Sequence, residues 1–190
     1  LTHRSSMAFF PVSAEHVLSA AKRQGVGHLV LLSIVGVTRQ EARRAIGYYA
    51  GKAAQEDRYL ASGMPVTVVA TTGWFTLAEK FLTQITLGSM ALIPPTLLQP
   101  VHPAAAAAAL VDAVEAGPGV TRVELAGPER LRADEMARRL ASTRGEAVRV
   151  LRVPFPSRAF REGAMLPAPT ARIDDRTYAA WLDSLRPNLD

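Results

Sequence analysis

Short apolar runs recur along the chain, and polar residues or glycines bound each of them. HLVLLS is too short for a helix and shows no alternation of apolar and polar positions, which is typical of a strand buried on both faces. VTVVAT is a second buried, β-branched strand, and RVELAG is a third strand. A fourth run alternates, as a half-exposed strand does. The predicted strands are HLVLLS at 28–33, VTVVAT at 66–71, RVELAG at 122–127 and AVRVLRV at 147–153.

Segments with helical spacing of apolar residues separate these strands. Ser13 is a candidate N-cap for the first segment, and Gly25 is its candidate C-terminal stop. The second segment ends at Ser62-Gly63, with Pro65 just beyond. The predicted helices are 13–24, 41–61, 76–87, 104–117 and 131–142, with helical turns near 156–164 and 174–185 and a Pro-rich loop with one short strand at 94–103.

Helices and strands alternate with short connections, which predicts an α/β fold with a parallel sheet and crossover helices. Ligands bind such sheets at the carboxyl ends of the strands. The residues that follow the predicted strands are therefore candidate site residues. They are Ser33, the run Thr71-Thr72-Gly73-Trp74-Phe75, and Ala126-Gly127. Trp74 and Phe75 could wall a pocket, or they could be core for the helix that follows.

Composition narrows the function classes. The 190 residues suit one domain, and the absence of cysteine favours a reducing cytoplasm. The most apolar region, at 85–101, is broken by three prolines and is a poor membrane span. The net charge is +5, but arginines alternate with acids and no aromatic-studded basic run occurs, which argues against nucleic acid. The four histidines lack metal-ligand spacing. We therefore expect a cytoplasmic protein that acts on a small molecule.

Tyr48 and Lys52 lie four residues apart in the predicted helix 41–61, so they share one helix face. A tyrosine has an unperturbed pKa of about 10, and a nearby ammonium favours its phenolate, which would move Tyr48 toward acid–base use. The same lysine could bind sugar hydroxyls. By itself the short pattern favours the alternative, in which Tyr48 packs and Lys52 is solvated. The surrounding order of elements favours a working pair.

Three pieces carry that order: AAKRQGVGHLVLLSIVG, YYAGKAAQEDRYLASGMPVTVVATTGWF and VELAGPERLRADEMARRL, together with the loop VHPAAAAAALVDAV. In this succession they resemble the second half of the short-chain dehydrogenase/reductase superfamily, in particular its atypical, NmrA-like NAD(P)-binding branch. The resemblance covers nearly the whole chain. It implies an incomplete Rossmann-like doubly wound parallel sheet with a small C-terminal α+β substrate-binding region.

The resemblance also implies roles for single residues. Tyr48 matches the superfamily's proton-donating tyrosine, and Lys52 matches the lysine that holds the nicotinamide ribose and lowers the pKa of that tyrosine. The implied cofactor is NAD or NADP, with NADP slightly preferred. The implied cofactor contacts are Thr2, Ser33, Lys52, Thr71, Thr72, Gly73, Trp74 and Phe75. The superfamily's catalytic serine usually stands a residue or two beyond Ser33, where this chain has Ile34 and Val35.

The front of the chain departs from the superfamily, because neither G-x-x-G-x-x-G nor G-x-G-x-x-G occurs in it. If Leu1-Thr2 ends the fourth strand, residues 1–127 are the C-terminal portion of a Rossmann-like domain, with 74–100 contributing to the substrate region. Residues 128–190 then form a small substrate-binding region. One edge of HLVLLS would be unpaired, so we expect self-association.

Three functions remain open at this point. The first is part of an NAD(P)-dependent oxidoreductase that transfers a hydride to a small carbonyl or quinone-like acceptor. The second is a non-catalytic, NAD(P)-sensing regulator of NmrA type that binds a protein partner. The third is a truncated fragment without activity of its own.

Overall fold

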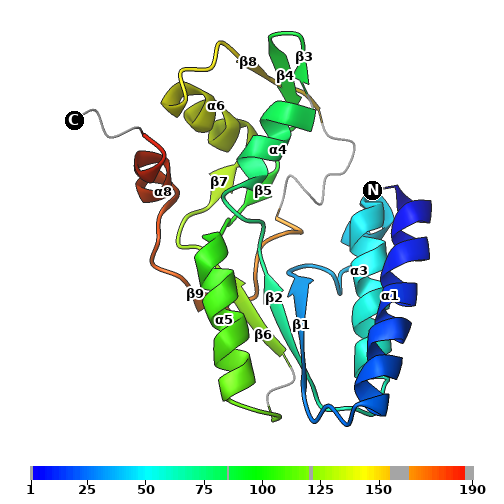
Figure 1. Ribbon diagram of the computed structural model, residues 1–190. Helices are drawn as coiled ribbons and strands as arrows, with labels where there is room; N and C mark the ends of the chain where they lie inside the picture. The colour runs from blue at the N-terminus through cyan, green and yellow to red at the C-terminus, as the bar shows by residue number, and fades with distance from the viewer. Residues whose placement is uncertain (1, 85, 120–121, 155–162, 187–190) are drawn as a thin grey trace.

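The computed structural model describes residues 2–84, 86–119, 122–154 and 163–186 (Figure 1). A parallel sheet forms its lower half in the order β1-β2-β6-β9. The strands are β1 (Leu29–Ile34), β2 (Val66–Thr71), β6 (Arg122–Ala126) and β9 (Arg172–Ile173). β1 pairs with β2 from Leu29↔Val66 to Ile34↔Thr71, so the two strands end together. The predicted α/β fold is confirmed, and the strands predicted at 28–33, 66–71 and 122–127 are present as β1, β2 and β6.

Helices cover both faces of this sheet (Figure 1). On one face, α1 (His3–Arg23) and α3 (Gly47–Leu60) pack over Leu31 and Val68. On the other, α5 (Pro103–Glu115) places its alanines against Val69 and Leu125. Its N-terminus is capped by His102, whose Nδ1 accepts from the Ala104 N–H at 3.0 Å. His102 therefore has a structural role as the N-cap of α5.

The upper part of the molecule is a smaller α+β layer around a second core (Figure 1). Phe75 is buried there against Tyr178 and Trp181, so Trp181 packs in this core. β9 returns from this half of the chain to the main sheet and pairs with β6. The elements of this part are α4 (Leu77–Gln84), β3 (Thr86–Leu87), β4 (Met90–Ile93), β5 (Leu97–Leu98), β7 (Leu131–Arg132), α6 (Ala133–Thr143), β8 (Arg149–Arg152) and α8 (Tyr178–Ser184).

Two helix predictions were wrong in extent. The first helix starts at His3, with Thr2 as its N-cap, and runs through Pro11; the Ser13 hydroxyl caps nothing and donates to the Phe10 carbonyl instead. Packing against α3 outweighs the local cost of the proline. The predicted helix 41–61 is two helices, α2 (Gln40–Ala45) and α3, because Ile46 is extended between them. The break at Ile46 separates α2 from α3, and Tyr48 lies in the first turn of α3.

Other boundaries also differ from the sequence prediction. The helix predicted at 76–87 ends at Gln84, and an antiparallel β3–β4 pair follows. The turn predicted near 156–164 lies largely outside the described residues. Among the described helices, none combines the length and apolar character that crossing a membrane requires.

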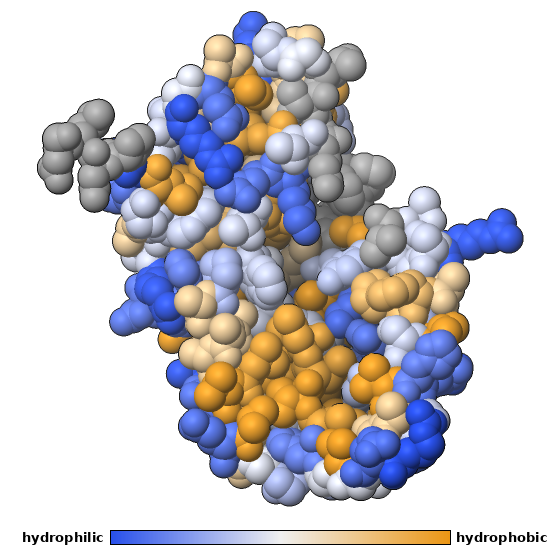
Figure 2. Space-filling model, viewed as in Figure 1, coloured by the Kyte–Doolittle hydropathy of each residue, from blue (hydrophilic) through white to orange (hydrophobic). Residues whose placement is uncertain are grey.

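One edge of β1 has no partner strand among the described residues. α1 packs on α3, so residues 3–12 do not fold back over this edge. Figure 2 shows a hydrophobic area over the region of β1 and α5. Val111 and Val114 of α5 are exposed, at 55% and 61% of their surface. An unpaired, uncharged strand edge beside exposed apolar surface is a site for association.

We therefore expect the 190-residue chain to self-associate in a concentration-dependent way. Size-exclusion chromatography with light scattering measures the mass. Lysines at Val111 and Val114 should shift the equilibrium toward monomer, because charge opposes apolar association. Lysine at Val12, which is exposed on α1 away from the sheet, is the matched control. A monodisperse wild-type monomer at every concentration would contradict this prediction.

Candidate functional site

A cleft of about 710 Å³ opens at the carboxyl ends of β1 and β2. The smaller layer supplies its far wall through α4 and the segment that follows β4. Most of the lining is apolar, and its only charged side chains among the described residues are Lys52 and Lys80. The lining residues are Leu32, Ser33, Ile34, Ile46, Tyr48, Tyr49, Lys52, Thr71, Thr72, Gly73, Trp74, Thr76, Leu77, Lys80, Phe81, Pro94, Thr96, Leu98 and Met165.

Lys52 reaches from α3 to the end of β1. Its Nζ donates to the Leu32 carbonyl at 2.7 Å and to Gln55 Oε1 at 2.6 Å. Its ammonium also lies 5.4 Å from the centre of the Phe10 ring, on α1. Burial lowers the pKa of Lys52 to about 8, and the nearby Glu56 carboxylate opposes this shift. An ammonium has three donors, so two fixed acceptors leave one N–H for a ligand.

Tyr48 stands one helical turn before Lys52 and also lines the cleft. Its ring packs edge-on against Phe10, with centroids 5.4 Å apart, and against Tyr49. Burial raises the pKa of Tyr48. This differs from the expected lowering of that pKa by Lys52. The phenol therefore stays protonated near neutral pH, as a proton donor requires.

Ser33 takes part in a buried network on the α3 side of the sheet. Its hydroxyl donates to Glu56 Oε2 at 2.6 Å. The other oxygen of Glu56 accepts from the Arg122 guanidinium, which also lies 3.6 Å from Glu124. The Ser33 hydroxyl therefore donates its proton within the protein, although Ser33 also lines the cleft.

The loop after β2 is fixed at several atoms. The Trp74 indole N–H donates to Thr71 Oγ1 at 3.0 Å, and the Thr72 hydroxyl donates to the Gln99 carbonyl at 2.6 Å. The Gln99 side chain in turn donates to the Gly127 carbonyl at 2.8 Å. Three loops at the carboxyl ends of strands are therefore tied to one another beside the cleft.

No protein-family model matches the sequence, and no curated protein matches it either. Solved structures do match. An NADPH-dependent quinone oxidoreductase from Escherichia coli aligns with a TM-score of 0.66 and 17% identity, over 90% of this chain and 72% of that one. A nucleoside-diphosphate-sugar epimerase from Staphylococcus aureus aligns with a TM-score of 0.65 and 14% identity, over 89% and 69%. A dTDP-4-dehydrorhamnose reductase from Bacillus anthracis, in complex with NADP, aligns with a TM-score of 0.59 and 15% identity, over 92% of this chain and 66% of that one.

The chain has the Rossmann-like α/β fold of these structures. In Rossmann-like sheets the ligand crevice lies outside the carboxyl ends of the strands, where the cleft of this chain opens. Its lining brings together most of the residues that the sequence singled out: Ser33, Tyr48, Lys52, Thr71, Thr72, Gly73 and Trp74.

Two predicted cofactor contacts do not line the cleft. Thr2 is the N-cap of α1, where its hydroxyl accepts from the Ser5 N–H at 3.1 Å. Phe75 points into the core of the smaller layer. Sequence reasoning missed Phe10 and Gln55, which hold Lys52. The contact of Gln55 with Lys52 could have been predicted from the sequence, because residues three apart on a helix are neighbours.

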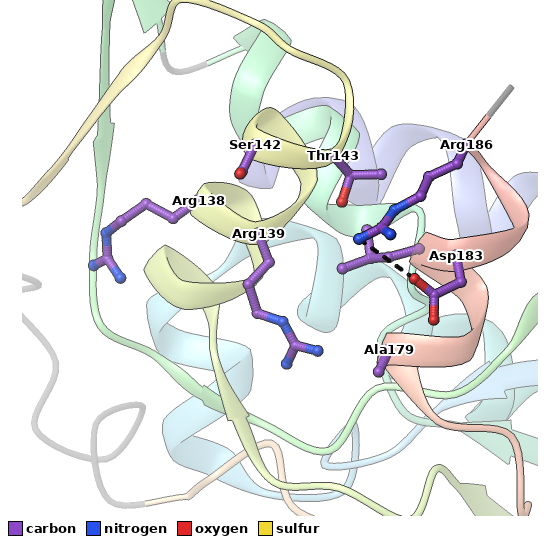
Figure 3. Close-up of a pocket in the computed structure, with 8 residues that line it drawn as sticks. Arg138, Arg139, Ser142, Thr143, Ala179, Asp183 and Arg186 are labelled. Carbon is purple, nitrogen blue, oxygen red and sulfur yellow. Dashed lines mark ion pairs between the residues drawn. The ribbon is translucent and has the colours of Figure 1, made fainter. Parts of the chain in front are cut away.

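A second hollow, of about 410 Å³, lies between α6 and α8 (Figure 3), and its lining shares no residue with that of the cleft. Its arginines are already matched: Arg138 pairs with Asp134, Arg139 with Glu135, and Arg186 with Asp183. Each arginine that lines the hollow therefore has a carboxylate partner, although Arg138 shares Asp134 with Arg152. Across the described residues, no group of three or more His, Cys, Asp or Glu side chains could hold a metal ion.

We expect Lys52 to titrate near pH 8 and Glu56→Gln to lower that value further, because the substitution removes an attraction that raises it. NMR of ¹³Cε-labelled lysine measures the titration. The chain has three lysines, and Lys52→Arg identifies the signal that belongs to Lys52. A Lys52 signal that titrates near the unperturbed value of about 10.4 would show that the ammonium is solvated.

Proposed function

We propose that this chain forms the nicotinamide and substrate end of an NAD(P)-dependent oxidoreductase that reduces a small carbonyl or quinone-like acceptor. The observation that carries the proposal is the position of Lys52. Its ammonium is held at the end of β1 by two fixed acceptors, with Tyr48 one turn away on the wall of the same cleft. The Rossmann-like fold and its NADPH- and NADP-linked structural neighbours support this proposal.

The residues of the cleft fit the nicotinamide end of such a cofactor. The remaining N–H of Lys52 is available to a ribose hydroxyl. Gly73 fits closely beside the Leu77 side chain, since a Cβ at this position would lie 3.2 Å from it. Thr71 and Thr72 line the same side of the cleft. We propose NADP over NAD on the family resemblance.

When bound, the cofactor supplies the hydride. The side chains of this chain supply position and the proton. A carbonyl carbon that gains a hydride passes its π electrons to oxygen, and the Tyr48 phenol donates its proton to that oxygen. The Lys52 ammonium stabilises the resulting phenolate, which then recovers a proton from solvent. The apolar lining limits access of water to this exchange.

The pyrophosphate end of a dinucleotide needs backbone N–H groups that a Gly-rich turn supplies in this fold. The chain contains no such motif. As an isolated 190-residue polypeptide it is expected to bind NAD(P)H weakly or not at all. Titration of nicotinamide fluorescence measures the affinity, and a Kd in the micromolar range would show that the turn is unnecessary. The function itself is tested by acceptor-dependent oxidation of NAD(P)H by the complete natural protein.

A second candidate is a non-catalytic, NAD(P)-sensing regulator of NmrA type. The position of Ser33 favours it, because this hydroxyl donates to Glu56 and the next two residues are Ile34 and Val35. No serine then polarises a substrate carbonyl from this strand. Cofactor binding without turnover, together with co-purification of a protein partner, would favour the regulator.

A further inference from the structure

Trp74 presents an indole ring to the cleft in a fixed orientation. Its N–H donates to Thr71 Oγ1 at 3.0 Å, and Thr71 is itself buried at the end of β2. The backbone on either side is tied to one residue: the Val101 N–H donates to the Gly73 carbonyl, and the Phe75 N–H donates to the Val101 carbonyl. Phe75 is 1% exposed in the core of the smaller layer. The backbone of Trp74 is therefore held in place, and its ring cannot turn without breaking the bond to Thr71.

This ring remains available for contact with a ligand. Trp74 keeps 36% of its surface exposed. The other tryptophan, Trp181, stacks on Tyr178 with centroids 5.3 Å apart. Within the described parts of the chain, Trp74 has no aromatic neighbour of this kind. An indole held in place and left exposed in an apolar cleft is a ready surface for stacking.

The charge of the cleft limits what its ligand can be. Around the described lining, the only cations are Lys52, which two protein acceptors already hold, and Lys80 at the exposed surface of α4. The lining contains no arginine among these residues. A substrate with a diphosphate, such as a nucleotide sugar, would find few partners for its charge. An uncharged ring would find apolar walls in Leu77, Phe81 and Leu98.

From these observations we propose that the acceptor is an uncharged, planar quinoid or aromatic carbonyl compound that stacks on Trp74, and that Trp74 determines this specificity. The inference rests on the proposed function, since it names the substrate class of the same cleft. Thr71 is a positioning residue in this arrangement, because it acts through the indole N–H. The nicotinamide ring is the other planar group that could occupy this place.

Equilibrium dialysis of the 190-residue chain tests the proposal without any turnover, at concentrations below self-association. The probes are 1,4-naphthoquinone, a saturated bicyclic diketone of similar size, and nicotinamide mononucleotide. We expect the naphthoquinone to bind more tightly than the saturated diketone. Trp74→Leu should weaken naphthoquinone about 2- to 10-fold, Trp74→Phe less, and neither should change affinity for the diketone. Melting curves check that both variants fold, which the exposure of Trp74 favours.

Equal affinity for the planar and the saturated ligand, or no effect of Trp74→Leu, would overturn the proposal. Displacement of naphthoquinone by nicotinamide mononucleotide, with the same loss in Trp74→Leu, would assign the ring contact to the cofactor and also overturn it. Planar-selective binding in a complete protein that oxidises no NAD(P)H would leave the binding site intact and refute the proposed reaction. The two failures are therefore distinguishable.

Discussion

In the complete natural protein, Tyr48→Phe is expected to lower turnover by about 10²–10⁴-fold while cofactor affinity stays nearly the same. The substitution removes the proton donor and keeps the ring that packs on Phe10. Lys52→Ala is expected to harm both turnover and affinity, because the proposed cofactor contact uses the remaining donor of Lys52 and the substitution removes the positive charge from the cleft of Tyr48. Steady-state kinetics and nucleotide titration measure the two quantities separately.

Tyr59→Phe is the matched control for this prediction. Tyr59 lies on the same helix but packs with Leu18 and Leu31 on the face of the sheet, away from the cleft. It should keep its turnover. Unchanged turnover in Tyr48→Phe, in a folded protein, would remove the catalytic role of Tyr48 and favour the regulator.

The second large effect is expected at Gly127. A Cβ at this position would lie 1.8 Å from the Pro100 carbonyl oxygen, which is backbone and cannot rotate away. Gly127→Ala should therefore force the loops before α5 and after β6 apart, at a cost of about 1–3 kcal/mol or more in the free energy of unfolding. The Gln99 hydrogen bonds to Gly127 and Thr72 would be strained too, so the cleft should lose ligand affinity.

Gly27→Ala is the control for Gly127→Ala, since a Cβ at Gly27 meets no atom within 4 Å. Urea unfolding of both variants compares their midpoints. A Gly127→Ala midpoint equal to that of Gly27→Ala would mean that the three loops can separate freely. The tight connection between the loop of Thr72 and the end of β6 would then be irrelevant to stability.

Local patterns were sufficient for the parts of the molecule that depend on near neighbours. VTVVAT is largely buried and HLVLLS is half-buried, and both have the short, mostly apolar character that predicts parallel strands. Tyr48 and Lys52 share a helix face because of their spacing alone. These two features already placed the cleft at the correct edge of the sheet.

Contacts between distant segments decided the rest. α1 extends through Pro11 because α3 packs along it, and the sequence near Pro11 argues against a helix there. Phe10 reaches Lys52 across 42 positions of the chain, as the helix pairing dictates and no local pattern could reveal. The bond from Ser33 to Glu56, and the burial that raises the pKa of Tyr48, likewise depend on how α3 lies on β1.

The activity proposed for the cleft of Tyr48 and Lys52 is hydride transfer to a carbonyl or quinone-like acceptor. The most direct test follows NADPH oxidation by the complete natural protein with 1,4-naphthoquinone as acceptor. We predict oxidation that requires the acceptor, consumes one NADPH per quinone reduced to hydroquinone, and falls about 10²–10⁴-fold in Tyr48→Phe. Tight binding of NADPH with no oxidation, for this quinone and for a panel of small aldehydes and ketones, would contradict it.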